Sequence, residues 1–239
     1  MENKIRLDLS PKLNSFLESM STQNSELQKV KLTRHEEIAP GVFIIGFSRR
    51  HDFIPGQTVK LGIDEIQPPR IYSICSGTKD DELCVLYNIK DDGFLTPRLA
   101  KLKVGDTLYA SAPGGTFFGT EDPAWWIATG TGIAPFRAMI RSGMGQNKKL
   151  VHGVRHLNQF YFSKELAKGL GPHYHRCCSA ETTDGVHPGR VTAFLENRND
   201  LFKDWKYYIC GQAQMAVETR DLLIEKGIPF ENIVTEIYF

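Results

Sequence analysis

The spacing of apolar residues along the chain changes near its midpoint. From Val30 to about Phe118, short apolar runs are separated by turn residues such as Pro40-Gly41 and Pro55-Gly56. Short β-rich runs at this spacing predict a small antiparallel β-barrel. We expect its strands at 42–45, 58–61, 70–75, 83–89 and 107–111, with a short helix over 95–102 as a cap on one barrel end.

After Pro113-Gly114-Gly115, strand-like runs alternate with helical stretches, which predicts a parallel α/β sheet. The expected strands are 124–129, 149–154, 176–179, 207–210 and 233–237. The clearest helix covers 214–226 and ends at Gly227, before Pro229. Its apolar side is expected to carry Met215, Val217, Leu222 and Leu223.

These two patterns predict a β + α/β chain with two domains. The N-terminal antiparallel β-barrel is expected over 27–120 and the parallel α/β domain over 121–239. Residues 1–26 are polar and serine-rich with a weak helical pattern, and we interpret them as an appended arm. Two structures are possible for this arm: a helix docked on a domain edge or on a second subunit, and a partly disordered leader.

Composition narrows the classes of partner. The chain has 239 residues, with 29 basic and 28 acidic ones, so a formal charge of +1 favours neither nucleic acid nor an anionic membrane as a partner. It shows no apolar run of spanning length and no signal-peptide core, so we expect no membrane insertion and a cytoplasmic location.

The cysteines and histidines form no ligand motif. Five cysteines without a C-x-x-C pair indicate reduced thiols rather than a disulfide framework or an iron-sulfur cluster. His173 and His175 are expected to face water in a polar loop, and no metal site is predicted.

A glycine turn stands at the start of the second domain. The run from Trp125 to Phe136 places an apolar strand, the glycines Gly130 and Gly132, and then Pro135 in that order. Glycines let backbone approach a phosphate, the free amides and helix dipole attract the anion, and proline suits a first helical position. This order predicts a nucleotide pyrophosphate site, with an ordinary strand-to-helix turn as the alternative.

Three further segments accompany this turn: Arg70-Ile71-Tyr72-Ser73, Cys210-Gly211-Gln212, and Glu236 to Phe239. Together, and in this order, the four segments resemble the ferredoxin-NADP reductase family, most of all the bacterial ferredoxin (flavodoxin)-NADP reductases. The resemblance runs from about residue 27 to the end. It implies bound FAD, NADP(H) as a substrate, and ferredoxin or flavodoxin as a partner docking near the flavin edge.

In the first domain, the resemblance implies that Arg70 binds the FAD phosphate, Tyr72 stacks on the flavin ring and Ser73 hydrogen-bonds near N5. The residues alone are also consistent with a strand carrying a surface arginine and a half-buried tyrosine. Backbone around Tyr87 and Ile89 is expected beside the flavin. A second phosphate loop is expected at Gly93, Phe94, Leu95 and Thr96, with the Thr96 hydroxyl available as a helix cap.

In the second domain, the resemblance implies that Cys210 lies beside nicotinamide C4, that Glu236 lies near the reaction centre, and that Tyr238 stacks opposite Tyr72 and moves aside for nicotinamide. Phe239 is expected near adenine. Ser73, Cys210, Glu236 and Tyr238 form the expected catalytic set. The other expected nucleotide contacts are Gly130, Thr131, Gly132, Ile133, Pro135, Gly211, Gln212 and Met215.

One position departs from the family pattern. A 2′-phosphate is bound by arginines and a free 2′-hydroxyl by a carboxylate. The family places a serine-arginine pair after the third strand of this domain, whereas this chain has Ser179 followed by Ala180. Because Arg155 and Arg190 match family positions, NADP(H) is expected, with NAD(H) as the alternative.

The resulting hypothesis is an FAD-dependent oxidoreductase that transfers a hydride between NADP(H) and FAD and exchanges single electrons with ferredoxin or flavodoxin. An acidic partner would use a basic rim, for which Arg98, Lys101 and Lys103 are candidates. Three alternatives stay open: an NADH-dependent reductase that supplies an oxygenase, a flavin reductase that releases its flavin, and a non-enzymatic nucleotide-binding regulatory subunit.

Overall fold

The first half of the chain forms a curled antiparallel sheet. The structure, a computed structural model, describes residues 27–238. Its first sheet has the order β4-β3-β6-β1-β2-β5, and every neighbouring pair is antiparallel. A bridge from Ile74 to Val85 brings the two outer strands together, so the predicted barrel is confirmed. The strands are β1 (Gln28–Ala39), β2 (Val42–Ser48), β3 (Thr58–Gly62), β4 (Arg70–Ser73), β5 (Glu82–Asn88) and β6 (Thr107–Ala110).

The longest strand, β1, is absent from the expected set. Only Val30 and Leu32 of its twelve residues are buried, and charged residues fill half of the other ten positions. The strand pairs with β6 at its start and with β2 along the rest, and its pairing with β2 has two register irregularities. Because a strand that bends between two neighbours exposes much of its length, it lacks a clear apolar alternation.

The second half of the chain forms the expected parallel sheet, with the order β10-β9-β8-β7-β11-β12. Its strands are β7 (Ala124–Thr129), β8 (Lys148–Val154), β9 (Tyr174–Cys178), β10 (His187–Pro188), β11 (Lys206–Gln212) and β12 (Ile233–Tyr238). Four α-helices accompany it: α3 (Ala134–Arg141), α4 (Ser163–Leu170), α5 (Val191–Glu196) and α6 (Ala213–Glu225). Short 3-10 turns lie at η1 (Gly130–Ile133), η2 (Leu157–Gln159), η3 (Gly171–His173) and η4 (Phe230–Asn232).

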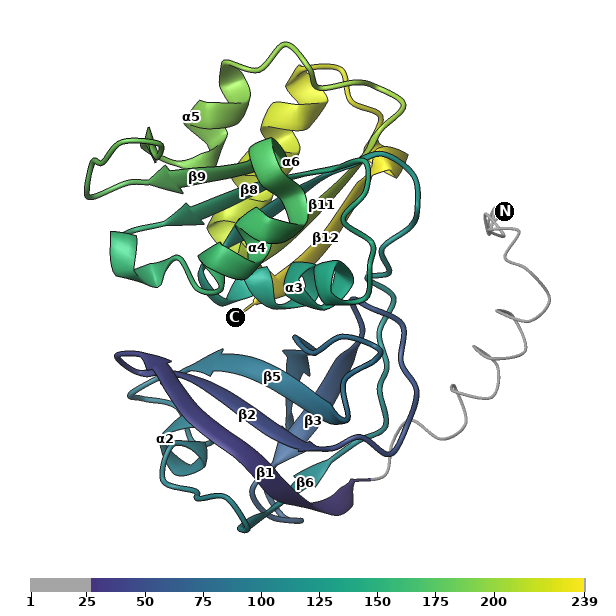
Figure 1. Cartoon of the computed structure of the whole chain (residues 1–239), viewed down its shortest axis with the longest axis vertical. Coiled ribbons are helices and arrows are strands. Elements are labelled where there is room, and N and C mark those ends of the chain that lie inside the picture. Colours follow the sequence, from purple (N-terminus) through teal and green to yellow (C-terminus); the bar gives the residue numbers. More distant parts are fainter. Residues whose placement is uncertain (1–26, 239) are drawn as a thin grey trace, which may run out of the picture.

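The helices cover both faces of this sheet (Figure 1). Trp126 packs in a cluster with residues of α3 and α4, while its neighbour Trp125 packs in a cluster with residues of α5 and α6. Both indoles are completely buried. Successive side chains of a strand point to opposite faces, so a strand covered on both sides is apolar throughout. This explains why β7 has the predicted bounds.

A side-chain network joins α3 to the first sheet. Arg141 donates to both carboxylate oxygens of Asp80, at 2.8 and 2.7 Å. Arg137, which is 8% exposed, donates to the carbonyl oxygen of Cys75 at 3.1 Å and to Glu165 at 2.9 Å. Buried residues of both sheets, such as Leu86 and Trp126, also belong to one apolar cluster. The helix that follows the glycine turn is therefore held against the barrel.

The expected short helix is present as α2, but it covers only Thr96–Leu99. Two other local expectations are wrong. In α6, Val217 is 40% exposed, while Ala216, Thr219 and Leu223 are buried. His175 lies on β9 and not in a loop, with its ring 5.7 Å from that of Trp125 and 5.0 Å from that of Phe194. Packing against aromatic rings accounts for its burial, and burial lowers its pKa to about 4.

The interpretation of residues 1–26 as an arm lies outside the described residues. None of the helices in the described range 27–238 is long and apolar enough to cross a membrane. All five cysteines are buried free thiols.

Candidate functional site

Four side chains from both halves of the chain meet where the sheets face each other. Ser73, at the end of β4, donates a hydrogen bond to Glu236 on β12 at 2.5 Å. The hydroxyl of Tyr238 donates to Ser73 at 2.6 Å. The thiol of Cys210, on β11, lies 3.9 Å from the same Glu236 oxygen. The structure thus brings together the four residues of the expected catalytic set.

Strand geometry explains this arrangement. In the parallel register of β11 and β12, Cys210 lies opposite Glu236, and Gln212 lies opposite Tyr238. Glu236 and Tyr238 are two residues apart, so their side chains leave the strand on the same side. That side faces Ser73, since both residues reach its hydroxyl.

Burial controls the protonation of this cluster. It raises the pKa of Glu236, an effect opposed by the hydrogen bonds from Ser73 and Cys210. It also raises the pKa of the Cys210 thiol well above its usual value, and Glu236 adds to that rise. A thiol whose pKa is raised stays protonated and is a poor nucleophile. The cluster can therefore orient a ligand and hold protons, but it does not contain an activated thiolate.

The glycine turn packs directly on this cluster. A Cβ atom at Gly132 would lie 2.2 Å from the carbonyl oxygen of Cys210, so only glycine permits this approach. Gly211 has a φ of +150°, and a Cβ there would lie 2.3 Å from the Thr129 hydroxyl oxygen. By contrast, a Cβ at Gly130, whose φ is +55°, would have no neighbour within 4 Å. The turn is closed towards β11 and open on its other side.

The open side fits a nucleotide pyrophosphate. Residues Gly130, Thr131, Gly132 and Ile133 form η1, and Pro135 stands near the start of α3, where an amide donor is not needed. The first amides of a helix lack intrahelical acceptors and attract anions. The Thr129 hydroxyl is buried and has no hydrogen-bond partner within the described part of the chain. The sequence prediction did not include Thr129, although it directly precedes the glycine turn.

The remaining predicted contacts on this side lie at the start of α6. Gln212 is exposed and precedes the helix. Met215 is half-buried; its sulfur accepts a hydrogen bond from Thr219 at 3.5 Å, and its methyl group lies close to Gly211. Phe239 lies outside the described residues.

On the barrel side, β4 presents the predicted flavin residues. Arg70 is exposed, Ser73 is buried, and Tyr72 is half-buried with its ring 6.2 Å from that of Tyr87 in an edge-on contact. Burial raises the pKa of Tyr72 to about 12, so its phenol stays protonated. Tyr87 is 2% exposed, and its ring stacks on Phe43 in the barrel core, so its side chain is not open to a ligand.

The loop before α2 differs in one detail from the expectation. Thr96 does not cap its helix, because its hydroxyl accepts a hydrogen bond from the amide of Lys90 at 2.9 Å. That bond and the one from the Gly93 amide to the Lys90 carbonyl fold the loop back on itself. Leu95 is buried, Ile89 is half-buried, and Phe94 is 39% exposed with the Arg98 guanidinium 3.8 Å above its ring. Arg98 is thus held on this loop.

The predicted residues for the 2′ position lie at the ends of three elements. Arg155 follows β8, Ser179 follows β9, and Arg190 precedes α5; all three are exposed. Arg190 lies 3.6 Å from Glu218 on α6. The structure also shows a side-chain contact that the sequence prediction missed: Glu181 Oε1 lies 2.6 Å from Nδ1 of His156, the residue after Arg155.

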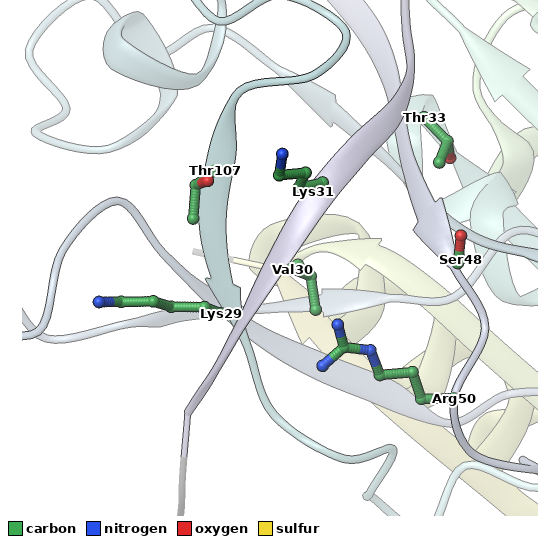
Figure 2. A pocket seen from close by; sticks show the side chains of 7 residues that line it. All are labelled: Lys29, Val30, Lys31, Thr33, Ser48, Arg50 and Thr107. Atoms are coloured by element: carbon green, nitrogen blue, oxygen red, sulfur yellow. The ribbon is translucent and has the colours of Figure 1, made fainter.

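A second basic feature lies on the barrel, at an open groove of about 470 Å³ beside β1 and β6 (Figure 2). Its cationic side chains are Lys29, Lys31 and Arg50. None of its lining residues belongs to the cluster around Ser73 or to the other predicted site residues.

Comparison with known proteins connects this geometry to chemistry. Residues 126–221 match the family model of an oxidoreductase NAD-binding domain. The chain is 30% identical to the flavodoxin/ferredoxin-NADP reductase of Escherichia coli (strain K12), in an alignment that covers 70% of this chain and 77% of the relative. It is 29% identical to the toluate 1,2-dioxygenase electron transfer component of Pseudomonas putida over 77% of this chain, but spans only 58% of that relative.

The fold has a solved counterpart. A ferredoxin NADP+ reductase from Neisseria gonorrhoeae with bound FAD and NADP superposes with a TM-score of 0.82 and 23% identity, over 90% of this chain and 100% of that one. This similarity confirms the β + α/β fold class.

Proposed function

This chain belongs to the ferredoxin-NADP reductase family, and from this premise we propose that it is an FAD-dependent oxidoreductase that transfers a hydride between NADP(H) and FAD and exchanges single electrons with ferredoxin or flavodoxin. The observation that carries the proposal is the hydrogen-bonded cluster of Ser73, Glu236 and Tyr238 beside Cys210. It joins the barrel strand with the predicted flavin residues to the end of the nucleotide sheet.

Each half of the chain has a separate task in this proposal. Residues 27–120 hold FAD, with Arg70 at its phosphate and Tyr72 against its ring, and residues 121–239 hold the nicotinamide nucleotide. An exposed guanidinium and a half-buried phenol on one strand fit a flat, anionic cofactor. When bound, FAD converts the two-electron chemistry of a nicotinamide into single-electron transfer. The free, buried thiols fit a reducing compartment such as the cytoplasm.

In this proposal the residues of the cluster hold one another in position, and one of them makes room for nicotinamide. Ser73 donates to Glu236 and accepts from Tyr238, so its hydroxyl is held in one orientation. Because Tyr238 occupies the junction between the sheets, we propose that its ring moves aside when nicotinamide enters. The protonated thiol of Cys210 and the close-packed Gly132 shape the entry side by their size alone.

The proposal is tested by anaerobic titration of the purified protein with NADPH, and separately with NADH, while the visible flavin absorption is followed. We expect yellow protein whose flavin is bleached by nucleotide. A colourless protein that takes up no FAD on reconstitution would overturn the proposal. Flavin that is lost during purification and turns over only as a free substrate would indicate a flavin reductase instead.

The partner is proposed to dock near the flavin edge, at the basic side chains Arg98, Lys101 and Lys103. Lys101 and Lys103 are exposed, and Arg98 is held over Phe94 on the predicted FAD loop. Replacing all three by glutamine should weaken the salt dependence of electron transfer to an acidic ferredoxin. The matched control replaces Lys29, Lys31 and Arg50 in the separate groove of Figure 2, which should leave the salt dependence unchanged. The reverse pattern would place docking at that groove.

A second candidate function has one specific observation behind it. The chain carries Ala180 where the family has an arginine, and the toluate dioxygenase component shows that relatives include electron suppliers of oxygenases. The titration separates the two candidates, because the oxygenase reading requires bleaching by NADH at lower concentration than by NADPH.

A further inference from the structure

The strand that carries Ser73 ends in a hydrogen bond from the other half of the chain. Just past β4, the amide of Cys75 donates to the carbonyl of Cys84 on β5 at 2.8 Å. A continued antiparallel ladder would return a bond from the Cys84 amide to the Cys75 carbonyl. That amide donates instead to the Ser76 hydroxyl, at 3.0 Å. The Cys75 carbonyl is left to Arg137 on α3, whose Nη1 donates to it at 3.1 Å.

The surroundings of Arg137 fix its guanidinium in one orientation. Its Nε atom donates to Glu165 at 2.9 Å, and the guanidinium carbon lies 4.1 Å from the centre of the Phe162 ring. A planar group held by a carboxylate, a carbonyl and a ring has little freedom to turn. An apolar residue of similar length would fill this buried space without the cost of burying a charge. What the arginine adds is the direction of its hydrogen bonds.

The segment from Ser73 to Cys75 is rigid enough to pass a displacement from one end to the other. Ser73 lies opposite Thr58 of β3, and the amide of Ile74 donates to the carbonyl of Gln57 at 3.0 Å. All three residues of the segment are at most 2% exposed. Extended backbone rises about 3.3 Å per residue, so the Cys75 contact lies about 7 Å along the chain from Ser73. A shift of that contact would therefore move the Ser73 hydroxyl.

The same helix also holds the nucleotide turn. α3 lies on the side of the nucleotide half that faces the barrel (Figure 1). The turn η1 leads directly into α3, and Arg137 is the fourth residue of the helix, about 5 Å along its axis from the start. Gly132 in the turn packs on the carbonyl of Cys210. One helix thus connects the Cys210 side of the cluster to the strand of Ser73.

We propose that Arg137 is a positioning residue that sets the place of the Ser73 hydroxyl relative to the glycine turn, through the carbonyl of Cys75. The inference rests on the proposed function and adds a residue to its machinery. In the described part of the chain, all hydrogen bonds of the Arg137 side chain go to Cys75 and Glu165. Its effect on the cluster therefore passes through the backbone of the segment that follows β4.

The first test is Arg137→Ala, with Arg141→Gln as the matched control. Arg141 lies one turn further along α3 and also links it to the barrel, but through the side chain of Asp80. We expect flavin bleaching by saturating NADPH to slow about 10–100-fold in Arg137→Ala with an unchanged KM, because misplacement slows the reaction without weakening binding. Arg141→Gln should keep the wild-type rate. An unchanged rate in Arg137→Ala, or equal losses in both variants, overturns the inference.

Arg137→Met keeps most of the packing and removes the donors. It should show the same slow rate as Arg137→Ala, and it keeps the test decisive if the alanine variant folds poorly. A methionine variant that bleaches at the wild-type rate would show that packing alone is sufficient, and would overturn the inference.

Free guanidinium gives a readout that a merely structural role would not move. Arg137 lines an open cleft of about 310 Å³ between β1, β2 and residues 158–162, so a small cation can reach the space left by alanine. Guanidinium at concentrations far below those that unfold proteins should restore part of the rate in Arg137→Ala. Because guanidinium lowers stability, that recovery cannot come from a more stable fold. Methylammonium, which has the charge without the planar donors, should not restore it. Equal rates in the two salts would contradict the assignment.

Hydrogen exchange separates this inference from the proposed function, because it needs no turnover. A hydrogen bond from a charged donor contributes enough to change a local opening equilibrium about tenfold. The amides of Ile74 and Cys75 should therefore exchange about tenfold faster in Arg137→Ala than in the wild type or in Arg141→Gln. That result without bleaching by either nucleotide would support the positioning role and overturn the proposed function. Normal bleaching with unchanged exchange would leave the proposed function intact and overturn the role of Arg137.

Discussion

Replacing Gly132 by alanine tests how tightly the nucleotide turn is joined to the reaction cluster. The new Cβ atom would lie 2.2 Å from the carbonyl oxygen of Cys210, 2.6 Å from its carbonyl carbon and 2.9 Å from Cα of Gly211. All three obstacles are backbone, so no side-chain rotation relieves them. An ordinary contact requires a separation above roughly 3 Å, so η1 and the end of β11 must part by about 1 Å.

The cost follows from the kind of obstacle. Overpacking commonly costs about 1–3 kcal/mol, and we expect the upper end, about 3 kcal/mol, because β11 is hydrogen-bonded on both sides. A displacement of about 1 Å in a reacting pair can also slow its reaction roughly 100-fold. Gly130→Ala is the control within the same turn: its Cβ would meet nothing within 4 Å, and only its φ of +55° is unfavourable. That strain costs about 1–2 kcal/mol.

The free energy of unfolding of both variants is measured in urea. Unfolding is monitored by the fluorescence of Trp125 and Trp126, which are buried in the strand before the turn. Stopped-flow bleaching of the flavin by saturating NADPH gives the rate. We expect Gly132→Ala to lose more stability than Gly130→Ala and to react more slowly. If Gly132→Ala unfolds within about 0.5 kcal/mol of the wild type and reacts at its rate, the close approach does not constrain the site, and the reasoning is refuted.

Further predictions address the cluster, the interface and the core. Tyr238→Ser should tighten nicotinamide binding and slow turnover, measured by nucleotide titration and steady-state kinetics; unchanged affinity would count against a moving ring. Burial raises the pKa of Glu236, so stability contributed by its protonated form is complete below the ordinary value of 4.5 and is lost as pH rises through the raised pKa. Glu236→Gln should therefore gain stability over the wild type as pH rises in urea unfolding. A double-mutant cycle of Arg141→Gln and Asp80→Asn should give a coupling of about 0.5–1 kcal/mol that weakens in salt, since both side chains are partly exposed. The pKa of His175 is lowered to about 4, so stability present above the ordinary value of 6.5 is lost as pH falls through about 4, and His175→Phe should remove that loss in thermal melts.

Much of the fold could be predicted because a strand buried on both faces is a run of consecutive apolar residues, which the sequence displays directly. The strand of Trp125 and Trp126 is apolar from Ala124 to Ala128, since helices cover both its sides. β1 has no such apolar run, because Lys29, Lys31 and Arg34 are solvent-exposed or half-buried on a strand that bends between two partner strands. Apolar spacing alone therefore does not reveal it.

Part of the candidate site could likewise be predicted from the sequence, and part could not. Ser73, Cys210 and Glu236 were identified from the order of four short segments, which a single sequence displays directly. The pairing of Glu181 with His156 depends on two loops that lie 25 positions apart in the chain and meet only in the folded sheet. The spacing of apolar residues does not predict such a contact, because tertiary structure determines which side chain lies next to an exposed charge.

The network between α3 and the barrel has a consequence for recombining the halves of related reductases. Arg137 donates to a main-chain carbonyl, that of Cys75, which a barrel of any sequence with the same backbone path would offer. Arg141 instead requires the Asp80 carboxylate in one orientation. A hybrid that combines this nucleotide half with the barrel of a relative would thus keep the hydrogen bond of Arg137 without any substitution. It would need a single introduced aspartate at the position of Asp80 to restore the ion pair with Arg141.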